Sequence, residues 1–162
     1  MKKAFSLIEL LIVILIIGIV YTISVSGFKR IKNSDEKLTL EILKSYLQKI
    51  PHTKSVKIEC VDECLKCNIF VDEKKSKKID TFVDKNVKSY RYDFSYGMVE
   101  LEKEDNVCFS YTINKEGVGE QIFVEFKGKV YDFSSYLGKT PVYNSITEAL
   151  EAKEKLFREV LK

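Results

Sequence analysis

The sequence predicts an α+β fold: a long N-terminal α-helix with a transmembrane first half, an antiparallel β-sheet packed on its second half, and a short C-terminal helix. Three observations predict it. Residues 4–28 are almost entirely apolar, apolar and polar residues alternate over much of 55–136, and a helix-capping pattern occurs at 145–148. A chain of 162 residues has room for one small domain and a membrane segment.

Charge and composition narrow the class of protein. Lys and Arg number 27 against 24 Asp and Glu, which leaves a net charge of +3. A nucleic-acid-binding protein usually concentrates basic residues on one face, and so small a positive excess argues against that function. Nine Tyr and ten Phe are enough to build a hydrophobic core.

The apolar N-terminal run is long enough to cross a bilayer as a helix. Between residues 4 and 28 it contains one charged residue, Glu9, and about 20 mostly apolar residues are sufficient for a transmembrane helix. Lys2 and Lys3 precede the run and are expected to stay on the cytoplasmic side. Three interpretations compete: an uncleaved signal anchor, a secretory signal peptide cut after the small residues at 24–26, and a leader removed near the N-terminus.

Residues 2–10, with the sequence KKAFSLIEL, favour the third interpretation. They closely resemble the N-terminal motif of type IV pilins and type II secretion pseudopilins: a short basic leader, a small residue, Phe, a hydroxyl residue, Leu-Ile, and a Glu at the fifth mature position. The resemblance, which covers about residues 2–30, implies that a prepilin peptidase cleaves between Ala4 and Phe5 on the cytoplasmic side. It also implies that Phe5, the new N-terminus, is N-methylated.

Two positions depart from the family pattern. Members usually have Gly just before the cut, where this chain has Ala4, and the motif leaves open whether this change slows processing. Many members also have Pro at the position of Ser26. Without that proline, the helix is expected to continue unbroken, because proline removes a backbone hydrogen bond and bends a helix.

Glu9 is a carboxylate in an apolar helix, which costs about 2.5–3.5 kcal/mol at the bilayer centre on insertion scales. Such a residue indicates a function that involves a partner. The resemblance implies that the partner is the positively charged amine of Phe5 in a neighbouring subunit of a filament, where a low dielectric strengthens the pair. The alternative is that Glu9 lies near the membrane interface and extends to water.

After residue 28 the chain is predicted to continue as an amphipathic helix. Its apolar residues recur at three- and four-residue spacings, which indicates a helix with one apolar face. They are Leu38, Ile42, Leu43, Tyr46, Leu47 and Ile50. Pro51 is expected to end the helix. An unbroken helix over residues 5–50 would be about 69 Å long at 1.5 Å per residue.

Alternation over 55–136 predicts an antiparallel meander with one face packed on the helix. The strands are expected around 56–60, 67–71, 90–94, 107–113, 122–126 and 130–131. The sequence KEGVG at 115–119 predicts a hairpin turn. The lysine-rich run at 74–78 is interpreted as a solvated loop, with a surface for an anionic partner as the alternative.

The C-terminus is predicted to form a short amphipathic helix. Ser145 and Glu148 have the spacing of a capping box, in which the two side chains satisfy free backbone donors at the start of a helix. The apolar residues that follow are Ala149, Leu150, Leu156, Val160 and Leu161.

The four cysteines, Cys60, Cys64, Cys67 and Cys108, are interpreted as two disulfides. A pilin-like anchor places the domain in an oxidising compartment, where disulfides persist. Three connectivities are open, and one bond must join Cys108 to the 60–67 segment unless Cys108 stays free. A tetrahedral zinc site is one alternative, although the chain has a single Cys-x2-Cys pair. A redox-active Cys64–Cys67 pair, without a thioredoxin-like context, is another.

No enzyme activity, cofactor or resident metal is predicted. His52 is the one histidine, so it cannot be half of a histidine metal pair, and no G-x-S-x-G nucleophile motif accompanies it. It is interpreted as an exposed loop residue. Phosphate-binding glycine loops and dinucleotide fingerprints do not occur. The residues around Asp132 do not form the oxygen-rich cluster that calcium requires.

The sequence thus predicts a prepilin leader at 1–4, a transmembrane and filament-core helix at 5–28, its amphipathic continuation at 29–50, and a periplasmic β-rich domain with a C-terminal helix at 51–162. The predicted function is that of a pilin-like structural subunit, a pseudopilin of a type II secretion or type IV pilus-like filament. The expected partners are prepilin peptidase, other pilin or pseudopilin subunits, the inner-membrane assembly platform and the lipid bilayer.

The expected location is the bacterial inner membrane, crossed once, with the domain in the periplasm and assembly into a periplasmic filament. Three alternatives stay open. The chain could be a minor pilin of a DNA-uptake system, for which nucleic acid becomes a partner, a membrane-tethered binding module that forms no filament, or a freely soluble secreted protein. The machine, the cargo and the major or minor status of the subunit are open as well.

Overall fold

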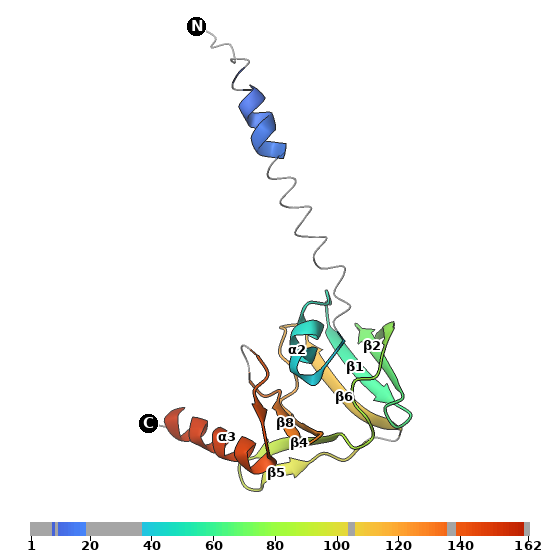
Figure 1. Cartoon of the computed structure of the whole chain (residues 1–162), viewed down its shortest axis with the longest axis vertical. Helices are drawn as coiled ribbons and strands as arrows, with labels where there is room; N and C mark the ends of the chain where they lie inside the picture. Colours follow the sequence, from blue (N-terminus) through green and yellow to red (C-terminus); the bar gives the residue numbers. More distant parts are fainter. Residues whose placement is uncertain (1–7, 9, 19–36, 104–105, 136–138, 161–162) are drawn as a thin grey trace. The chain divides into compact units, whose positions relative to one another are not determined.

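A computed structural model describes residues 8, 10–18, 37–103, 106–135 and 139–160 (Figure 1). The chain divides into two units, residues 1–36 and residues 37–162, and each is described by itself. In the first unit, residues 10–18 are helical. In the second, antiparallel sheets and a C-terminal helix form an α+β fold, which confirms the predicted fold class in these elements.

The second unit begins with a short helix, α2 (Leu40–Gln48). Leu40, Leu43 and Leu47 are buried on one face, and the helix ends before Pro51, which cannot continue it. Its start differs from the prediction. Residues 37–39 are not helical, and Thr39 has an extended backbone with φ −129° and ψ 163°. The carbonyl of Thr39 accepts the N–H of Leu43 at 3.0 Å, so Thr39 acts as the N-cap of a separate helix.

The first sheet has the strand order β3-β2-β1-β6, and all its pairs are antiparallel. Its strands are β1 (Ser55–Val61), β2 (Lys66–Val71), β3 (Lys74–Ile79) and β6 (Val107–Asn114). Alternate residues of β1 and β6 are buried, because successive side chains of a strand point to opposite faces. The alternation predicted for these segments is confirmed.

The lysine-rich run, predicted as a loop, forms strand β3 at the edge of this sheet. It pairs with β2, and five of its six residues are exposed. Alternation of apolar and polar residues arises when one face of a strand is buried. Because neither face of β3 is buried, its sequence lacks the alternation that identifies a strand. Lysines on an edge strand also discourage pairing with other chains.

The predicted single meander is divided between two sheets, which corrects the prediction. The second sheet has the order β5-β4-β7-β8-β9. Its strands are β4 (Lys88–Asp93), β5 (Gly97–Glu100), β7 (Phe123–Phe126), β8 (Lys129–Asp132) and β9 (Val142–Tyr143). β5 and β9 have four and two residues, which is too short for a clear period-two pattern.

The division arises directly after β6. The KEGVG segment turns the chain back, so that Ile113 bridges Gly119. A side chain at Gly119 would collide with the hydroxyl of Tyr111, which is why the position requires glycine. After Glu120 the chain leaves β6 and enters β7, which pairs with β4 and β8. The predicted turn is therefore present, but the strand after it belongs to another sheet.

The C-terminal helix is α3 (Ile146–Val160), as predicted. Ser145 Oγ accepts the N–H of Glu148 at 3.1 Å, which is one half of the expected capping box. In a capping box the carboxylate of Glu148 would accept the N–H of Ser145. Here it accepts the N–H of the preceding residue, Asn144, at 2.8 Å. Both bonds hold the start of the helix in place.

Two apolar clusters hold the second unit together. The larger one joins α2, the first sheet and one face of the second sheet, and it includes Leu43, Ile58 and Tyr111. The smaller one contains Phe123, Val130 and Ala149. It packs α3 against the opposite face of the second sheet, and Figure 1 shows α3 beside β8 and β5.

Candidate functional site

The helix at residues 10–18 carries apolar side chains on all sides. Its residues from Leu10 to Ile17 are between 47% and 63% exposed. Exposure of apolar surface to water is unfavourable by about 25 cal/mol per Å², and a helix that is apolar all round is normally buried in a protein or a bilayer. The segment is therefore suited to packing against lipid or other apolar helices.

Three predicted site residues lie outside the described residues. They are Ala4 and Phe5, predicted for leader cleavage and N-methylation, and Glu9, predicted for filament assembly. The predicted transmembrane segment at 5–28 extends past the described helix at both ends. No helix in the described part of the chain has both the length and the apolar character needed to cross a membrane.

The four cysteines form two disulfides, as predicted. Cys60 is bonded to Cys67, which lies opposite it in the register of β1 and β2. Cys64 lies in the loop between these strands and is bonded to Cys108 of β6, on the other side of β1. The sulfurs are therefore not thiolates of a zinc site, and Cys64 and Cys67 are not bonded to each other. Among the described residues, no His, Cys, Asp and Glu side chains cluster as metal ligands do.

The loop between β1 and β2 has an unusual backbone. Asp62, Glu63 and Cys64 have φ values of 55°, 55° and 68°, a region that is costly for residues other than glycine. The carboxylate of Asp62 accepts hydrogen bonds from Lys66 Nζ at 2.6 Å and Asn106 Nδ2 at 3.1 Å. These donors, Lys66 above all, lower the pKa of Asp62. The carboxylate of Asp62 thus helps to hold the loop that contains Cys64.

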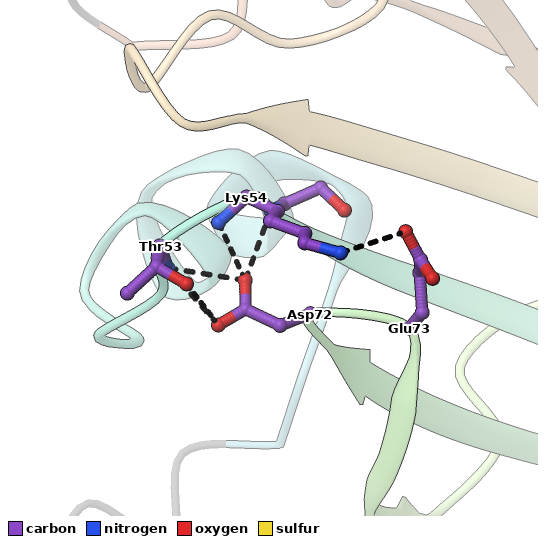
Figure 2. Close-up of polar contacts among 5 residues, drawn as sticks. Thr53, Lys54, Asp72 and Glu73 are labelled. Carbon is purple, nitrogen blue, oxygen red and sulfur yellow. Dashed lines mark hydrogen bonds and ion pairs between the residues drawn. The ribbon is translucent and has the colours of Figure 1, made fainter.

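Asp72, in the turn between β2 and β3, holds the segment that leads from α2 into β1 (Figure 2). Its carboxylate accepts the backbone N–H groups of Thr53, Lys54 and Ser55 at 2.6–3.1 Å. It also accepts the Thr53 hydroxyl at 2.8 Å. These donors, led by the Lys54 N–H, hold the pKa of Asp72 far below its usual value. Beside it, Lys54 and Glu73 form an exposed ion pair with 3.7 Å between nitrogen and oxygen.

The sequence predicts an exposed loop residue at His52, but both of its ring nitrogens contact backbone carbonyls. Nδ1 lies 2.8 Å from the Ile50 oxygen and Nε2 lies 2.9 Å from the Asn114 oxygen. Both carbonyls are satisfied only when both nitrogens carry protons, as in the imidazolium. The carbonyl of Ile50, followed by that of Asn114, raises the pKa of His52. The side chain thus joins the end of α2 to the end of β6.

A second polar network links α2, β8 and α3. Lys44 is buried, and its ammonium donates to the carbonyl of Ser135. Burial lowers the pKa of Lys44, and the charge of Asp132 opposes that shift. Asp132 accepts the Ser134 N–H at 2.7 Å and its hydroxyl at 2.6 Å, and Lys153 of α3 donates to the same hydroxyl at 2.6 Å. Sequence periodicity does not reveal this network, because its members come from three distant segments.

An exposed aromatic surface lies where the turn after β4 meets the second half of α3. The ring centroids of Tyr92, Phe94 and Phe157 are 4.9–5.5 Å apart. Phe94 and Tyr96 are 79% and 84% exposed. Exposed clusters of this composition are typical of surfaces that contact other proteins.

Comparison with known proteins bears on the N-terminus. A family model described as the prokaryotic N-terminal methylation motif matches residues 1–24. No curated protein and no solved structure matches the chain. The matched residues include the Ala4–Phe5 junction and Glu9, which the sequence alone singles out. The chain therefore carries the N-terminal methylation motif that is the signature of type IV pilins and pseudopilins.

Proposed function

We propose that the chain is a pseudopilin, a structural subunit of a type II secretion or type IV pilus-like periplasmic filament. The methylation motif at residues 1–24 is the observation that carries this proposal. The exposed apolar surface of the helix at 10–18 supports it, because such a helix is stabilised by packing against lipid or other subunits. The two disulfides agree with a domain located in the periplasm.

In this proposal the chain is inserted once in the inner membrane, with its second unit in the periplasm. Prepilin peptidase cleaves between Ala4 and Phe5, and Phe5 is N-methylated. The assembly platform then transfers the mature subunit from the membrane into a filament, where the Phe5 amine pairs with Glu9 of a neighbour. The role is mechanical, and no catalytic step is assigned to the chain.

Intact-mass spectrometry and N-terminal sequencing of the protein purified from membranes test the proposal. We expect a mature chain that starts at N-methylated Phe5, and an unprocessed chain in cells that lack prepilin peptidase. An Ala4→Gly variant, which has the residue usual in the family, should be processed at least as fast as the wild type. A mature start at Gly27 would indicate a secretory signal peptide, and an uncleaved Met1 a simple anchor; either result contradicts the proposal.

A minor pilin of a DNA-uptake system is the second candidate, and strand β3 is the observation that favours it. The four lysines of β3 are Lys74, Lys75, Lys77 and Lys78. All four are exposed, and none of them forms an ion pair with another described residue. Phosphates bind such clusters with an affinity that falls as salt rises. Fluorescence anisotropy of labelled duplex DNA with the full-length protein in detergent tests this. If replacing the four lysines with Gln leaves binding unchanged, this candidate is wrong.

A further inference from the structure

A cleft of about 280 Å³ lies in the second unit, between the first and second sheets. Phe109 and Ser110 of β6 line it, together with three residues of the second sheet or next to it: Arg91 in β4, Leu101 after β5 and Ile122 before β7. Ligand pockets usually measure about 300–1,000 Å³. The cleft is therefore suited to a short stretch of a ligand rather than to a large cofactor.

The free edge of β6 faces this cleft. β6 is the last strand in the order β3-β2-β1-β6. The carbonyl of Thr112 points away from β1, since it accepts the N–H of Glu120 at 3.0 Å. The backbone groups of every second residue point the same way in an antiparallel ladder, so the N–H and C=O of Ser110 also point away from β1. Within the described part of the chain, neither group has a hydrogen-bond partner.

An extended polypeptide is the ligand that matches unpaired groups on a strand edge. The chain itself uses β6 in this way for a short distance. Ile113 bridges Gly119, and the N–H of Asn114 donates to the carbonyl of Val118 at 2.9 Å. The chain then turns away after Glu120, which leaves the next positions along the edge, toward Ser110, uncovered. An incoming segment would continue the pairing that this short stretch begins.

The side chains of the cleft favour an uncharged segment. Arg91 and Lys103 are balanced by Glu102 and Glu120, so the cleft offers no excess of positive charge to a polyanion. Apolar contacts come from three residues that line the cleft: Leu101, Phe109 and Ile122. Such contacts suit the apolar side chains of a β-strand.

A second folded copy of the chain fits this site poorly. The cleft measures about 280 Å³ and is lined by residues of both sheets, so a single extended segment fits it better than the edge of a second folded sheet does. The lysine-rich edge strand β3 of another copy is charged along its length, which discourages pairing. We propose that the cleft binds an extended, uncharged segment of a different polypeptide, which adds as a strand to the edge of β6 at Ser110.

An acetylated and amidated Thr-Val-Thr-Val-Thr peptide is the probe. We expect its titration into the ¹⁵N-labelled full-length protein in detergent micelles to give saturable shifts at Ser110 with a millimolar Kd, and to slow exchange of the Ser110 amide at least tenfold. Two N-methylated peptides give the sharper test. Alternate amides of a strand face opposite edges. Methylation of the peptide amides that face β6 should weaken binding at least tenfold, whereas methylation of the amides that face away from β6 should not weaken it.

Two substitutions at one position give a matched pair. Ser110→Pro removes the unpaired N–H, and proline is tolerated on an edge strand where the N–H faces outward, so we expect a folded protein that binds the peptide at least tenfold more weakly. Ser110→Ala keeps both backbone groups and should bind as the wild type does. The N-methylated peptides test the proposal independently if the proline variant fails to fold.

Four results would overturn the proposal. They are the absence of saturable shifts up to 10 mM peptide, equal binding of both N-methylated peptides, wild-type binding by a folded Ser110→Pro variant, and protection of the Ser110 amide that rises with protein concentration without peptide. The last result would assign the edge to a second copy. None of them bears on N-terminal processing, so the pseudopilin proposal is tested separately.

Discussion

At the residue scale, Asp72 and His52 hold the loop between α2 and β1 through opposite charges. Asp72 accepts backbone N–H groups of this loop and does so best as a carboxylate. His52 donates to two backbone carbonyls and does so fully only as an imidazolium. The negative charge of Asp72 also contributes to the raised pKa of His52. Both contacts are complete only at a pH above the pKa of Asp72 and below that of His52.

An Asp72→Asn variant should be less stable than the wild type at pH 7. The pKa of Asp72 is lower in the folded state than its usual 3.8, so its contribution is fully present above about pH 4 and is lost as pH falls toward the folded-state pKa. Urea denaturation should therefore give a difference in midpoint at pH 7 that shrinks below pH 3. Glu73→Gln, which removes only an exposed ion pair, is the control and should differ little from the wild type. A gap that persists unchanged at pH 2.5 would contradict the assignment.

His52 should titrate above its usual pKa of 6.5. As the folded-state pKa is raised, the contribution of the imidazolium is fully present below about pH 6 and is lost as pH rises through the folded-state pKa. Because the chain has one histidine, an NMR titration of its ring carbon in the full-length protein gives an unambiguous value. A His52→Gln variant should remove the decrease in stability between pH 6 and 9. A measured pKa at or below 6.5 would show that the two carbonyl contacts are not both made.

At the element scale, the two disulfides hold β1 to its neighbours on both sides. The Cys60–Cys67 bond joins β1 to β2, across a hairpin that already keeps these strands together. The Cys64–Cys108 bond joins the loop at the end of this hairpin to β6, which is distant in the sequence. Because cross-linking reduces the freedom of the unfolded chain more when the closed loop is longer, the second bond should contribute more.

Removal of the two disulfides by paired Cys→Ser substitution should therefore have unequal effects. The Cys64–Cys108 bond spans 44 residues and should contribute about 4 kcal/mol to the free energy of unfolding. The Cys60–Cys67 bond spans 7 residues and should contribute about 2 kcal/mol. Urea denaturation of the two double variants measures the difference, and the wild type with dithiothreitol is the control that loses both bonds. An equal loss, or a larger one for Cys60–Cys67, would show that strain or packing outweighs chain entropy.

At the scale of the whole molecule, the features that support the proposed filament assembly and those that support the proposed peptide binding belong to different units. The methylation motif and the exposed apolar helix lie within residues 1–36. The cleft at β6 and the aromatic surface around Phe94 and Phe157 lie within residues 37–162. Changes in the first unit should therefore alter filament assembly without unfolding the second.

In the proposed filament Glu9 pairs with the Phe5 amine of a neighbouring subunit, so Glu9→Gln should reduce incorporation of the chain into filaments at least tenfold. A charged amine at Phe5 without its carboxylate partner would be left in a low-dielectric environment, which is unfavourable by a few kcal/mol. Quantitative immunoblotting of sheared filaments against the membrane fraction measures incorporation. Glu41→Gln, which changes an exposed acidic residue in α2, is the control. If Glu9→Gln enters filaments as well as the wild type does, the pairing role of Glu9 is wrong.

The sequence by itself determined the features that depend on local order. The methylation motif is a continuous run of residues, and the matched family model agrees with it. The helical spacing of Leu43 and Leu47 indicated which face of α2 is buried, and the alternation of β1 and β6 did so for those strands. Leu40, the third buried leucine of α2, was not among the predicted residues. The start of α3 follows from two polar side chains three residues apart, Ser145 and Glu148.

Only the tertiary structure decided which distant segments meet. Only the structure shows that Cys108 forms a disulfide with Cys64 and that the strands belong to two sheets. It also shows that the lysine-rich run is the strand β3. It also brought the carbonyl of Asn114 to His52 and left the edge of β6 uncovered. Periodicity records burial along one segment and carries no information on its partners in space. The N-terminal motif could therefore be identified from the sequence, whereas the contacts of the second unit required the fold.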